Sequence, residues 1–279
     1  MVGNSLVMVL IVADQNLHSP MYFFLGNFSC QETCYTSTIL PRLLASFLTG
    51  NRTISVSVCF TQMYFFGVLA TPDCYLLTAV SYDQYLAICK HLHYSALMST
   101  RSCLFLASGS WLRGWFATTI FTLFILHFKF CGPNEIDHFY CDVSPMMKLC
   151  CGDKFPILVF PFMESCIFTL LPFLLTLISY VCIITSILRI PSVTMRQKAF
   201  STCSSRLIMV TIFYVTLMIV YIISTFDTLR MLKKVFLLCY TVLTPLVNPL
   251  IYSLRNREAK EALSKALNQY VAVTLRQKC

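Results

Sequence analysis

Long apolar stretches, separated by short polar gaps, run along almost the whole chain. The hydrocarbon core of a bilayer takes about 20 consecutive apolar residues per helix, so we interpret each stretch as one membrane span. The pattern predicts an all-α membrane protein, a seven-helix transmembrane bundle in residues 1–254. The seven stretches are residues 1–13, 20–48, 54–88, 103–126, 155–188, 207–224 and 235–254.

These spans differ in length. The second, third and fifth exceed one crossing, so they are expected to tilt or to project beyond the bilayer. The first would rise only about 20 Å, against a hydrocarbon core of about 30 Å. A signal peptide is one interpretation, but the stretch lacks a basic leading region and a small-residue cleavage site. We therefore expect an N-terminally truncated first helix, with the rest of the span upstream of Met1.

Residues 255–279 form the expected cytoplasmic tail. In its segment RNREAKEALSKALNQY, apolar positions recur at helical spacing with Lys and Arg between them. This pattern predicts a short amphipathic helix that lies on the inner leaflet.

The composition supports a membrane protein. The chain is 57% hydrophobic and 12% charged, with a mean hydropathy of +0.71, whereas a soluble domain carries about 25% charged residues. A net charge of +9 can indicate nucleic-acid binding, but here the basic residues fall in the gaps between apolar stretches, so they indicate membrane lipid as the partner. The sequence has no Gly-rich phosphate loop, GxSxG or HExxH motif, which argues against an enzyme.

The distribution of Lys and Arg also predicts the orientation. Twelve lie in the gaps on one side of the membrane and eight in the gaps on the other. The positive-inside rule places the richer side, which includes the C-terminus, in the cytoplasm. With seven spans, the N-terminus is then extracellular.

Five motifs fall at the ends of the predicted spans in a fixed order. They are LHSPMYFFL at 17–25, SYDQYLAIC at 81–89, SY at 179–180, KAFSTCSSR at 198–206 and PLVNPLIYSLRN at 245–256. Together they resemble the odorant (olfactory) receptors, which are rhodopsin-like G-protein-coupled receptors of the plasma membrane. The resemblance covers nearly the whole chain. It implies a receptor without a cofactor that binds a small volatile odorant and raises cAMP through a heterotrimeric G protein of the stimulatory olfactory class.

The resemblance also implies two disulfides on the outer face, where the compartment is oxidising. The family pattern pairs the cysteine at the top of the third span with the middle cysteine of the following outer loop, here Cys59 with Cys141. It pairs two more cysteines within the loop, here Cys131 with Cys151, although the adjacent Cys150 could compete for this bridge. Both bridges would hold the loop over the bundle.

Two other kinds of site are considered on the outer face. A zinc site made of the loop cysteines and His138 is an alternative to the disulfides. Asn51 begins an N-glycosylation sequon close to the membrane. A second sequon begins at Asn27, but it lies inside the second predicted span and is expected to be inaccessible.

Burying an ionisable residue inside a membrane span costs free energy, so such a residue indicates a functional role. Glu32 of the second span and Asp73 of the third occupy positions where the family carries acids, and with Asn248 they could form one polar cluster. Such a cluster could be a cation or proton site that biases two packings of the helices, or a polar lock between them. Without a cation, one acid is expected to be protonated because close carboxylates disfavour double ionisation.

Arg113, in the WLRGW segment of the fourth span, has no functional explanation at this level. It should lie well inside the hydrocarbon zone, so a snorkelling or misplaced charge that weakens the fold is the plainest interpretation.

The predicted ligand pocket lies in the outer half of the bundle. Helical spacing from Cys59 places Met63, Phe66, Gly67 and Ala70 on one face of the third span. The family pocket uses this face. Such a pocket would be mostly apolar with a few polar anchors, and Glu164 would favour an amine or a hydrogen-bond donor. The candidate pocket residues are Met63, Phe66, Gly67, Ala70, Glu164, Phe168, Leu217, Met218, Tyr221 and Thr241.

The resemblance assigns G-protein coupling and switching to the cytoplasmic half. Gln84 stands where the family carries an Arg that contacts the G protein and pairs with the neighbouring acid at rest, so Asp83 is expected to lose its local partner. Arg206 in place of His and Val215 in place of Gly also depart from the family pattern, so coupling could be weak, biased or absent. The residues implied in coupling and switching are Asp83, Gln84, Tyr85, Tyr180, Lys198, Tyr214, Asn248, Pro249 and Tyr252.

Two alternatives to a signalling receptor are considered. A transporter or channel usually shows inverted repeats or helices broken at paired glycines, and the sequence shows neither. A receptor-like product with impaired folding or coupling is favoured by the short first span, by Gln84 and by Arg113.

Overall fold

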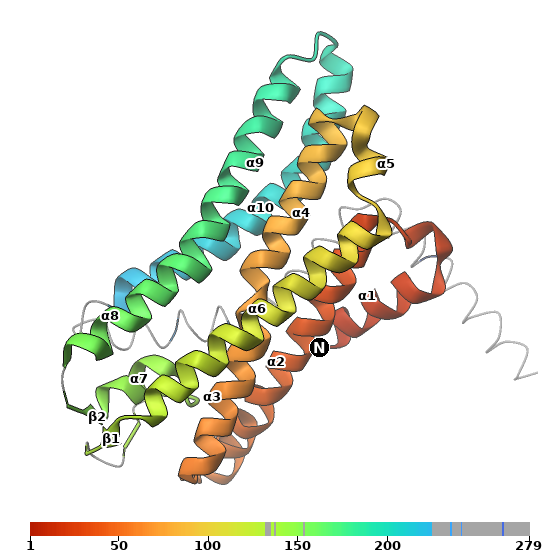
Figure 1. The fold of residues 1–279 in the computed structure, drawn as a ribbon. Helices are drawn as coiled ribbons and strands as arrows, with labels where there is room; N and C mark the ends of the chain where they lie inside the picture. Colours follow the sequence, from red (N-terminus) through yellow and green to blue (C-terminus); the bar gives the residue numbers. More distant parts are fainter. Residues whose placement is uncertain are drawn as a thin grey trace, which may run out of the picture.

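The fold is described from a computed structural model of the chain (Figure 1). The structure describes residues 1–131, 135–136, 138–152, 154–224 and the single positions 235, 241 and 264. These residues are almost entirely helical, with one short two-stranded sheet. The predicted seventh span at 235–254 and the tail at 255–279 lie, apart from the three single positions, outside the described residues and stay predictions.

Each of the six apolar stretches up to residue 224 contains one helix or a series of helices. In chain order the elements are α1 (Val2–Ala13), η1 (Gln15–Leu17), α2 (Pro20–Thr49), α3 (Val56–Ala70), α4 (Pro72–Cys89), η2 (His91–His93), α5 (Tyr94–Leu97), α6 (Thr100–Leu126), β1 (Lys129–Phe130), α7 (Val143–Lys148), β2 (Cys150–Cys151), α8 (Lys154–Ser165), the π-helical η3 (Cys166–Leu170), α9 (Leu171–Leu188) and α10 (Val193–Ser224).

The ends of α2 follow from residue types that start and stop helices. Pro20 occupies the first helical position, where its missing N–H would have no intrahelical acceptor anyway. Gly50 follows the last turn in the left-handed conformation, with a φ of 67°, which glycine adopts without steric cost. These two residues explain why the helix ends close to the limits of the apolar stretch at 20–48.

The third apolar stretch, predicted as one helix, is divided into α3 and α4 at Thr71. Pro72 begins α4 and cannot donate a backbone hydrogen bond to the preceding turn. The neighbouring α6 approaches this break closely, because a Cβ atom added at Gly114 would lie 2.5 Å from Cγ and Cδ of Pro72. Gly114 therefore allows α6 to pack directly against the junction.

Within the described residues, two segments are long and apolar enough to cross a membrane. One is Val56–Cys89, 34 residues that combine α3 and α4, and the other is Phe162–Leu188, 27 residues that include η3 and α9. In the second segment a π-helical turn precedes Pro172, the second residue of α9. Single π-helical turns inside α-helices are frequent at functional sites.

Helix α10 is longer than the apolar pattern predicts. The predicted span covers residues 207–224, whereas the helix begins at Val193. The added segment contains Met, Arg, Gln, Lys and Ala, which are good helix formers. An apolar pattern detects the part of a helix that suits lipid, and this helix continues into a polar sequence.

The long helices run side by side with α4 near the centre, where it packs against α2, α6 and α9 (Figure 1). The largest core cluster lies around α4 and includes the fully buried Leu76 and Ile183. The sheet pairs β1 with β2 antiparallel, with Lys129 opposite Cys151 and Phe130 opposite Cys150. This hairpin and α7 lie at the end of the bundle where α3 begins and α6 ends.

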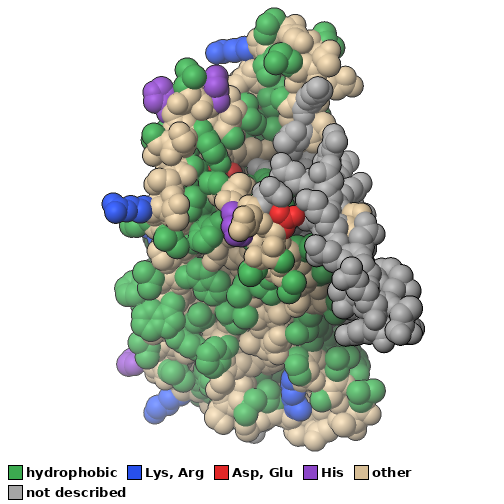
Figure 2. Space-filling view, turned by 90° about the vertical axis from the view of Figure 1, so that its right-hand side faces the viewer, with side chains coloured by type: hydrophobic (Ala, Val, Ile, Leu, Met, Phe, Trp, Pro, Cys, Tyr) green, Lys and Arg blue, Asp and Glu red, His purple; other side chains and the backbone are tan. Residues whose placement is uncertain are grey.

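The outer surface carries many large apolar side chains. Figure 2 shows hydrophobic side chains over nearly the full height of one face, with few Lys and Arg side chains among them. On α6, for example, Phe105 is 78% exposed and Leu112 65% exposed. Contiguous apolar surface of this kind is unusual on a soluble monomer and suits contact with lipid.

Candidate functional site

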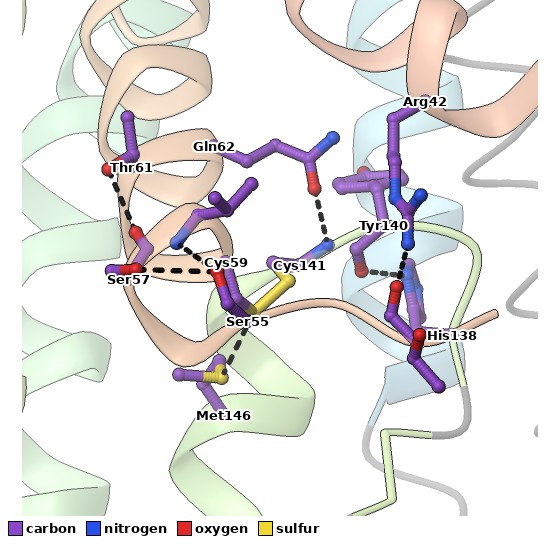
Figure 3. Close-up of a disulfide and its surroundings, with 12 residues drawn as sticks. Arg42, Ser55, Ser57, Cys59, Thr61, Gln62, His138, Tyr140, Cys141 and Met146 are labelled. Carbon is purple, nitrogen blue, oxygen red and sulfur yellow. Dashed lines mark hydrogen bonds between the residues drawn. A yellow bond between two sulfur atoms is a disulfide. The ribbon is translucent and has the colours of Figure 1, made fainter. Parts of the chain in front are cut away.

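The outer end of α3 is covered by the loop between α6 and α8. The structure joins Cys59, in the first turn of α3, to Cys141 in the loop, with 5.4 Å between their Cα atoms (Figure 3). Both cysteines are 3% exposed, and the thioether sulfur of Met146 lies 3.9 Å from Sγ of Cys59. This bridge holds the loop against the bundle, as the family resemblance implies.

Gln62 ties the same loop to two helices. Its Oε1 accepts a hydrogen bond of 3.2 Å from the backbone N–H of Cys141 (Figure 3). Its Nε2 donates one of 3.1 Å to the carbonyl of Thr38 in α2. The side chain is buried, so both ends of its amide are satisfied where water is excluded. The sequence gives no signal for this role of Gln62, because a polar residue one turn after Cys59 has no distinguishing pattern.

Tyr140 inserts from the loop into the helix bundle. Its ring packs against Phe66 of α3 at a centroid distance of 5.3 Å, and Phe66 in turn contacts Tyr35 of α2 at 6.0 Å. The Tyr140 side chain is 6% exposed, and its hydroxyl faces Thr241. Burial and then the negative charge of Asp142 raise the pKa of Tyr140 well above its usual value, so the phenol is a neutral hydrogen-bonding group under the loop.

The four predicted pocket residues of α3 do not have equivalent surroundings. Phe66 faces Tyr140, whereas Met63 belongs to the apolar cluster around the Cys59–Cys141 bridge. Gly67 faces α6, since a Cβ atom there would lie 2.7 Å from Cγ2 of Thr118. The structure thus gives Gly67 a role in the packing of α3 against α6, and Ala70 is half-buried.

The other predicted pocket residues come from three more segments. Glu164, near the end of α8, is half-buried, and Phe168 of η3 packs edge-on against Tyr75 of α4 at 6.5 Å. Leu217 and Met218 of α10 are half-buried, and Thr241 is 1% exposed. The side chain of Tyr221 lies outside the described part of the structure.

The second loop disulfide joins Cys131 to Cys151, with 5.8 Å between their Cα atoms. Cys150 precedes Cys151 in β2, and successive residues of a strand point to opposite faces. Accordingly Cys150 stays a thiol, with its sulfur 3.6 Å from the carbonyl oxygen of Met146. Since three of the loop cysteines form disulfides, the alternative zinc site lacks the thiolates that it would need.

The two sequons have different surroundings. Asn51 is exposed between α2 and α3, and its Oδ1 accepts hydrogen bonds from the N–H and the hydroxyl of Thr53. Asn27 of α2 is half-buried, and its Oδ1 accepts a bond of 3.3 Å from the indole N–H of Trp111 in α6. The first sequon is therefore the more accessible of the two.

The two intramembrane acids lie together in the bundle interior. Glu32 of α2 and Asp73 of α4 are 0% and 1% exposed, and their side chains are close enough to interact electrostatically. Glu32 also accepts a hydrogen bond of 2.9 Å from Nδ2 of Asn4, which is itself fully buried in α1. No motif in the sequence marks Asn4, and the predicted third member of the cluster, Asn248, lies outside the described residues.

At the C-terminal end of α4, Asp83 has a hydrogen-bond partner that the sequence motif does not reveal. The hydroxyl of Tyr94, in α5, donates a hydrogen bond of 2.7 Å to Oδ1 of Asp83. Tyr94 can do this because η2 and α5 fold back along the end of α4, a contact that the sequence motif does not show. Tyr85 of the same SYDQY motif stacks on Tyr82, with 6.3 Å between the ring centroids.

Gln84 and Tyr180 are joined across the bundle. The hydroxyl of Tyr180 in α9 donates a hydrogen bond of 3.2 Å to Oε1 of Gln84, which is 3% exposed. Nε2 of Gln84 is buried and has no hydrogen-bond partner among the described residues. This arrangement places a neutral bond between α4 and α9 at the position where the family carries an arginine.

A second tyrosine, Tyr214, packs against the same two helices, α4 and α9. Tyr214 of α10 is buried against Phe173, and its hydroxyl faces Thr78 of α4 and Thr176 of α9, which are 3.1 Å apart. It thus links three helices. The remaining switch candidates, Asn248, Pro249 and Tyr252, and the side chain of Lys198 lie outside the described part of the chain.

Arg113 has a defined contact that sequence analysis did not foresee. Its guanidinium lies over the ring of Tyr75, 4.8 Å from the centroid. The hydroxyl of Tyr75 donates a hydrogen bond of 3.2 Å to the carbonyl of Ile167 in η3. The interpretation of a misplaced charge is therefore incomplete, because Arg113 of α6 takes part in a contact that links α4 to the π-helical turn.

Comparison with known proteins agrees with this architecture. Residues 1–270 match the family model described as olfactory receptor. Human olfactory receptor 11A1 is 45% identical over 95% of this chain and 84% of its own length. Human olfactory receptor 10A2 is 41% identical over 98% of this chain and 90% of its own length. Mouse olfactory receptor 6Z7 is 43% identical over 95% of this chain and 85% of its own length.

Proposed function

The chain belongs to the olfactory receptor family, so it is an odorant-sensing G-protein-coupled receptor and not an enzyme, and on that premise we propose where it binds its ligand and how it signals. It is a multi-pass protein of the plasma membrane. The odorant binds in the outer half of the bundle, beneath the loop between α6 and α8. Binding activates a stimulatory G protein of the olfactory class and raises cAMP.

The insertion of Tyr140 beside Phe66 supports this ligand site. The loop is fixed to α3 by the Cys59–Cys141 bridge, and the adjacent Tyr140 reaches both Phe66 and Thr241. An aromatic wall with one hydroxyl anchor suits a small, mostly apolar ligand that carries a single polar group. The loop excludes water from the same region, which strengthens any hydrogen bond made there.

The site is tested by an odorant-panel cAMP assay in cells that express the full chain. Phe66→Ala removes aromatic contact area, and a loss of about 1.4 kcal/mol of binding free energy raises the half-maximal agonist concentration about tenfold. Tyr140→Phe should reduce the response to ligands with a hydrogen-bonding group and spare fully apolar ones. Phe139→Leu, at the exposed neighbour of Tyr140, is the matched control. Unchanged dose–response curves for Phe66→Ala and Tyr140→Phe, at equal surface expression, would contradict the proposed pocket.

The buried group formed by Asn4, Glu32 and Asp73 supports a second role in switching. Two carboxyls in one buried site can share a proton or bind a cation, and either event would favour one packing of α2 against α4. The alternative is a polar lock without a switching role. Glu32→Gln should abolish any dependence of agonist affinity on sodium concentration, whereas a lock alone would give an affinity that is independent of sodium in both forms.

The orientation with the N-terminus outside and the C-terminus in the cytoplasm is also a proposal. Asp83 and Gln84 would then face the G protein, and the disulfide-bonded loop would face the oxidising exterior. Epitope tags at the two ends of the chain, probed before and after permeabilisation of the cells, test this directly. An N-terminal tag that reacts only after permeabilisation would contradict it.

A further inference from the structure

We infer that the surface around Arg113 docks a transmembrane helix of another membrane protein that carries a carboxylate at mid-bilayer depth. This surface, the Arg113 surface, consists of Arg113 and Gly109 of α6 with Tyr75 of α4. Tyr75 also borders the predicted pocket residue Phe168, but Arg113 and Gly109 are exposed on the outside of α6 and belong neither to the proposed ligand site nor to the group of buried acids. The inference therefore goes beyond odorant binding and G-protein coupling.

The depth of Arg113 is the first observation. Helix α6 has 27 residues from Thr100 to Leu126, and Arg113 is its central residue. At about 1.5 Å per residue, the Arg113 backbone lies about 20 Å from either end. The side chain is exposed, as are Leu112 (65%) and Phe116 (60%) beside it. The cation therefore faces the hydrocarbon core of the bilayer.

The orientation of Arg113 is the second observation. An unconstrained arginine near the bilayer centre extends along the helix toward the headgroups. Here the guanidinium lies across the ring of Tyr75, and Tyr75 is itself fixed by its hydrogen bond to the carbonyl of Ile167. This contact holds the charge near the middle of the membrane and leaves its outer N–H groups available to a partner.

The charge itself indicates the chemistry of the partner. Charged residues inside a membrane pair with one another or with backbone carbonyls. Within the part of the chain that the structure describes, no carboxylate forms a salt bridge with Arg113. A carboxylate is the planar acceptor that matches the guanidinium fork. Lipid phosphate groups lie at the membrane surface, about 15 Å from the centre, so a protein side chain is the fitting anion.

Gly109 indicates that the partner is a helix. It lies one turn before Arg113 on the same face, it is exposed, and a Cβ atom added there would meet no described atom within 4 Å. Glycine inside a helix costs stability relative to alanine, and in contrast to Gly114 no contact with the described residues requires a glycine at position 109. Small residues on a membrane-facing surface let a second helix backbone approach closely.

The burial of the acids argues against a second copy of this chain as the partner. Of the acidic residues in the described helices, Glu32, Asp73 and Asp83 are at most 2% exposed. They cannot reach a neighbouring molecule without unfolding. Among the acids of the described helices, Glu164, which is half-buried in α8, is the one that could present a carboxylate to Arg113 of another copy, so it defines the competing outcome.

The test uses the full chain and a synthetic partner in the same membrane. The probe is a single-span helix of Leu and Ala with one Glu at its centre, and a matched probe carries Gln there. Association is measured by resonance energy transfer between fluorophores on the two chains in living cells. Interhelical polar contacts correspond to about a threefold to thirtyfold difference in association, so the Glu probe should exceed the Gln probe by that factor.

Three variants decide whether the Arg113 surface is responsible. Arg113→Leu should reduce the Glu probe to the level of the Gln probe, and Gly109→Leu should weaken it by blocking close approach. Arg101→Leu, which removes a cation from the cytoplasmic end of the same helix, should change nothing. Equal association of the Glu probe with the original chain and with Arg113→Leu would overturn the inference. Self-association of the receptor that is lost in Glu164→Gln would also overturn it, in favour of a second copy.

Discussion

Replacing Gln84 with arginine should raise the agonist-driven cAMP response. Gln84 is buried and accepts one hydrogen bond of 3.2 Å from Tyr180. A neutral bond of this kind contributes about 1 kcal/mol, and a buried N–H without a partner costs about 1–3 kcal/mol. Since Nε2 of Gln84 has no partner among the described residues, the amide contributes little net stability to either state.

Arginine changes this position in two ways. Its guanidinium offers five N–H donors and a permanent charge, and it can pair with the neighbouring Asp83, which accepts a hydrogen bond from the hydroxyl of Tyr94. A charge-assisted bond contributes about 1.5–3 kcal/mol, offset by the desolvation of the guanidinium. If a net 1 kcal/mol is realised when the G protein is bound, the response rises about fivefold.

The assay is agonist-driven cAMP in cells, normalised to surface expression of each variant. Gln84→Lys carries the charge without the planar fork and should give an intermediate response. Gln84→Leu removes the bond to Tyr180 and should give a response no higher than the original chain. An equal or lower response for Gln84→Arg, at equal surface expression, would refute the reasoning that Gln84 limits coupling.

Three further predictions concern the loop, the helix packing and the pocket. Cys141→Ser opens a bridge between residues 82 positions apart, which costs about 4–5 kcal/mol and should abolish surface expression, whereas Cys150→Ser should preserve it. Gly114→Ala should lower the thermal stability of the purified receptor by about 1–3 kcal/mol because its Cβ would overlap Pro72, whereas Gly109→Ala should be neutral or stabilising. Glu164→Gln should change the ligand preference, and identical dose–response curves for amines, alcohols and aldehydes would exclude a ligand contact for this carboxyl.

The apolar pattern locates helices well where local chemistry marks their ends. The stretch at 20–48 corresponds to α2 because Pro20 and Gly50 start and stop it. The pattern does not show the break at Thr71, although Pro72 is visible in the sequence, because a proline inside a membrane span can also be accommodated as a kink. The limit between α3 and α4 depends on how α6 packs there, through Gly114.

The sequence predicts only those residues of the candidate site that belong to a recognisable motif or residue pattern. The family resemblance predicts the pairing of Cys59 with Cys141, and the cost of acids inside membrane spans predicts a role for Glu32 and Asp73. Asn4 and Gln62, which bind these groups, are ordinary polar residues in their segments. Their roles depend on the rotation and depth of each helix, and these follow from side-chain packing between segments far apart in the sequence.

Arg113 shows how an interpretation from sequence changes once its neighbours are known. A cation at the centre of a membrane helix costs about 2.5–3.5 kcal/mol on the insertion scale, which favoured a defect. Its position over Tyr75 offsets about 0.5–2 kcal/mol through the cation–π contact. Roughly 0.5–3 kcal/mol then stays uncompensated, against about 0.6–2 kcal/mol that one interhelical polar contact supplies. A helix that carries a carboxylate at this depth would therefore offset most of the cost of the charge, and the adjacent Gly109 provides the space for its backbone.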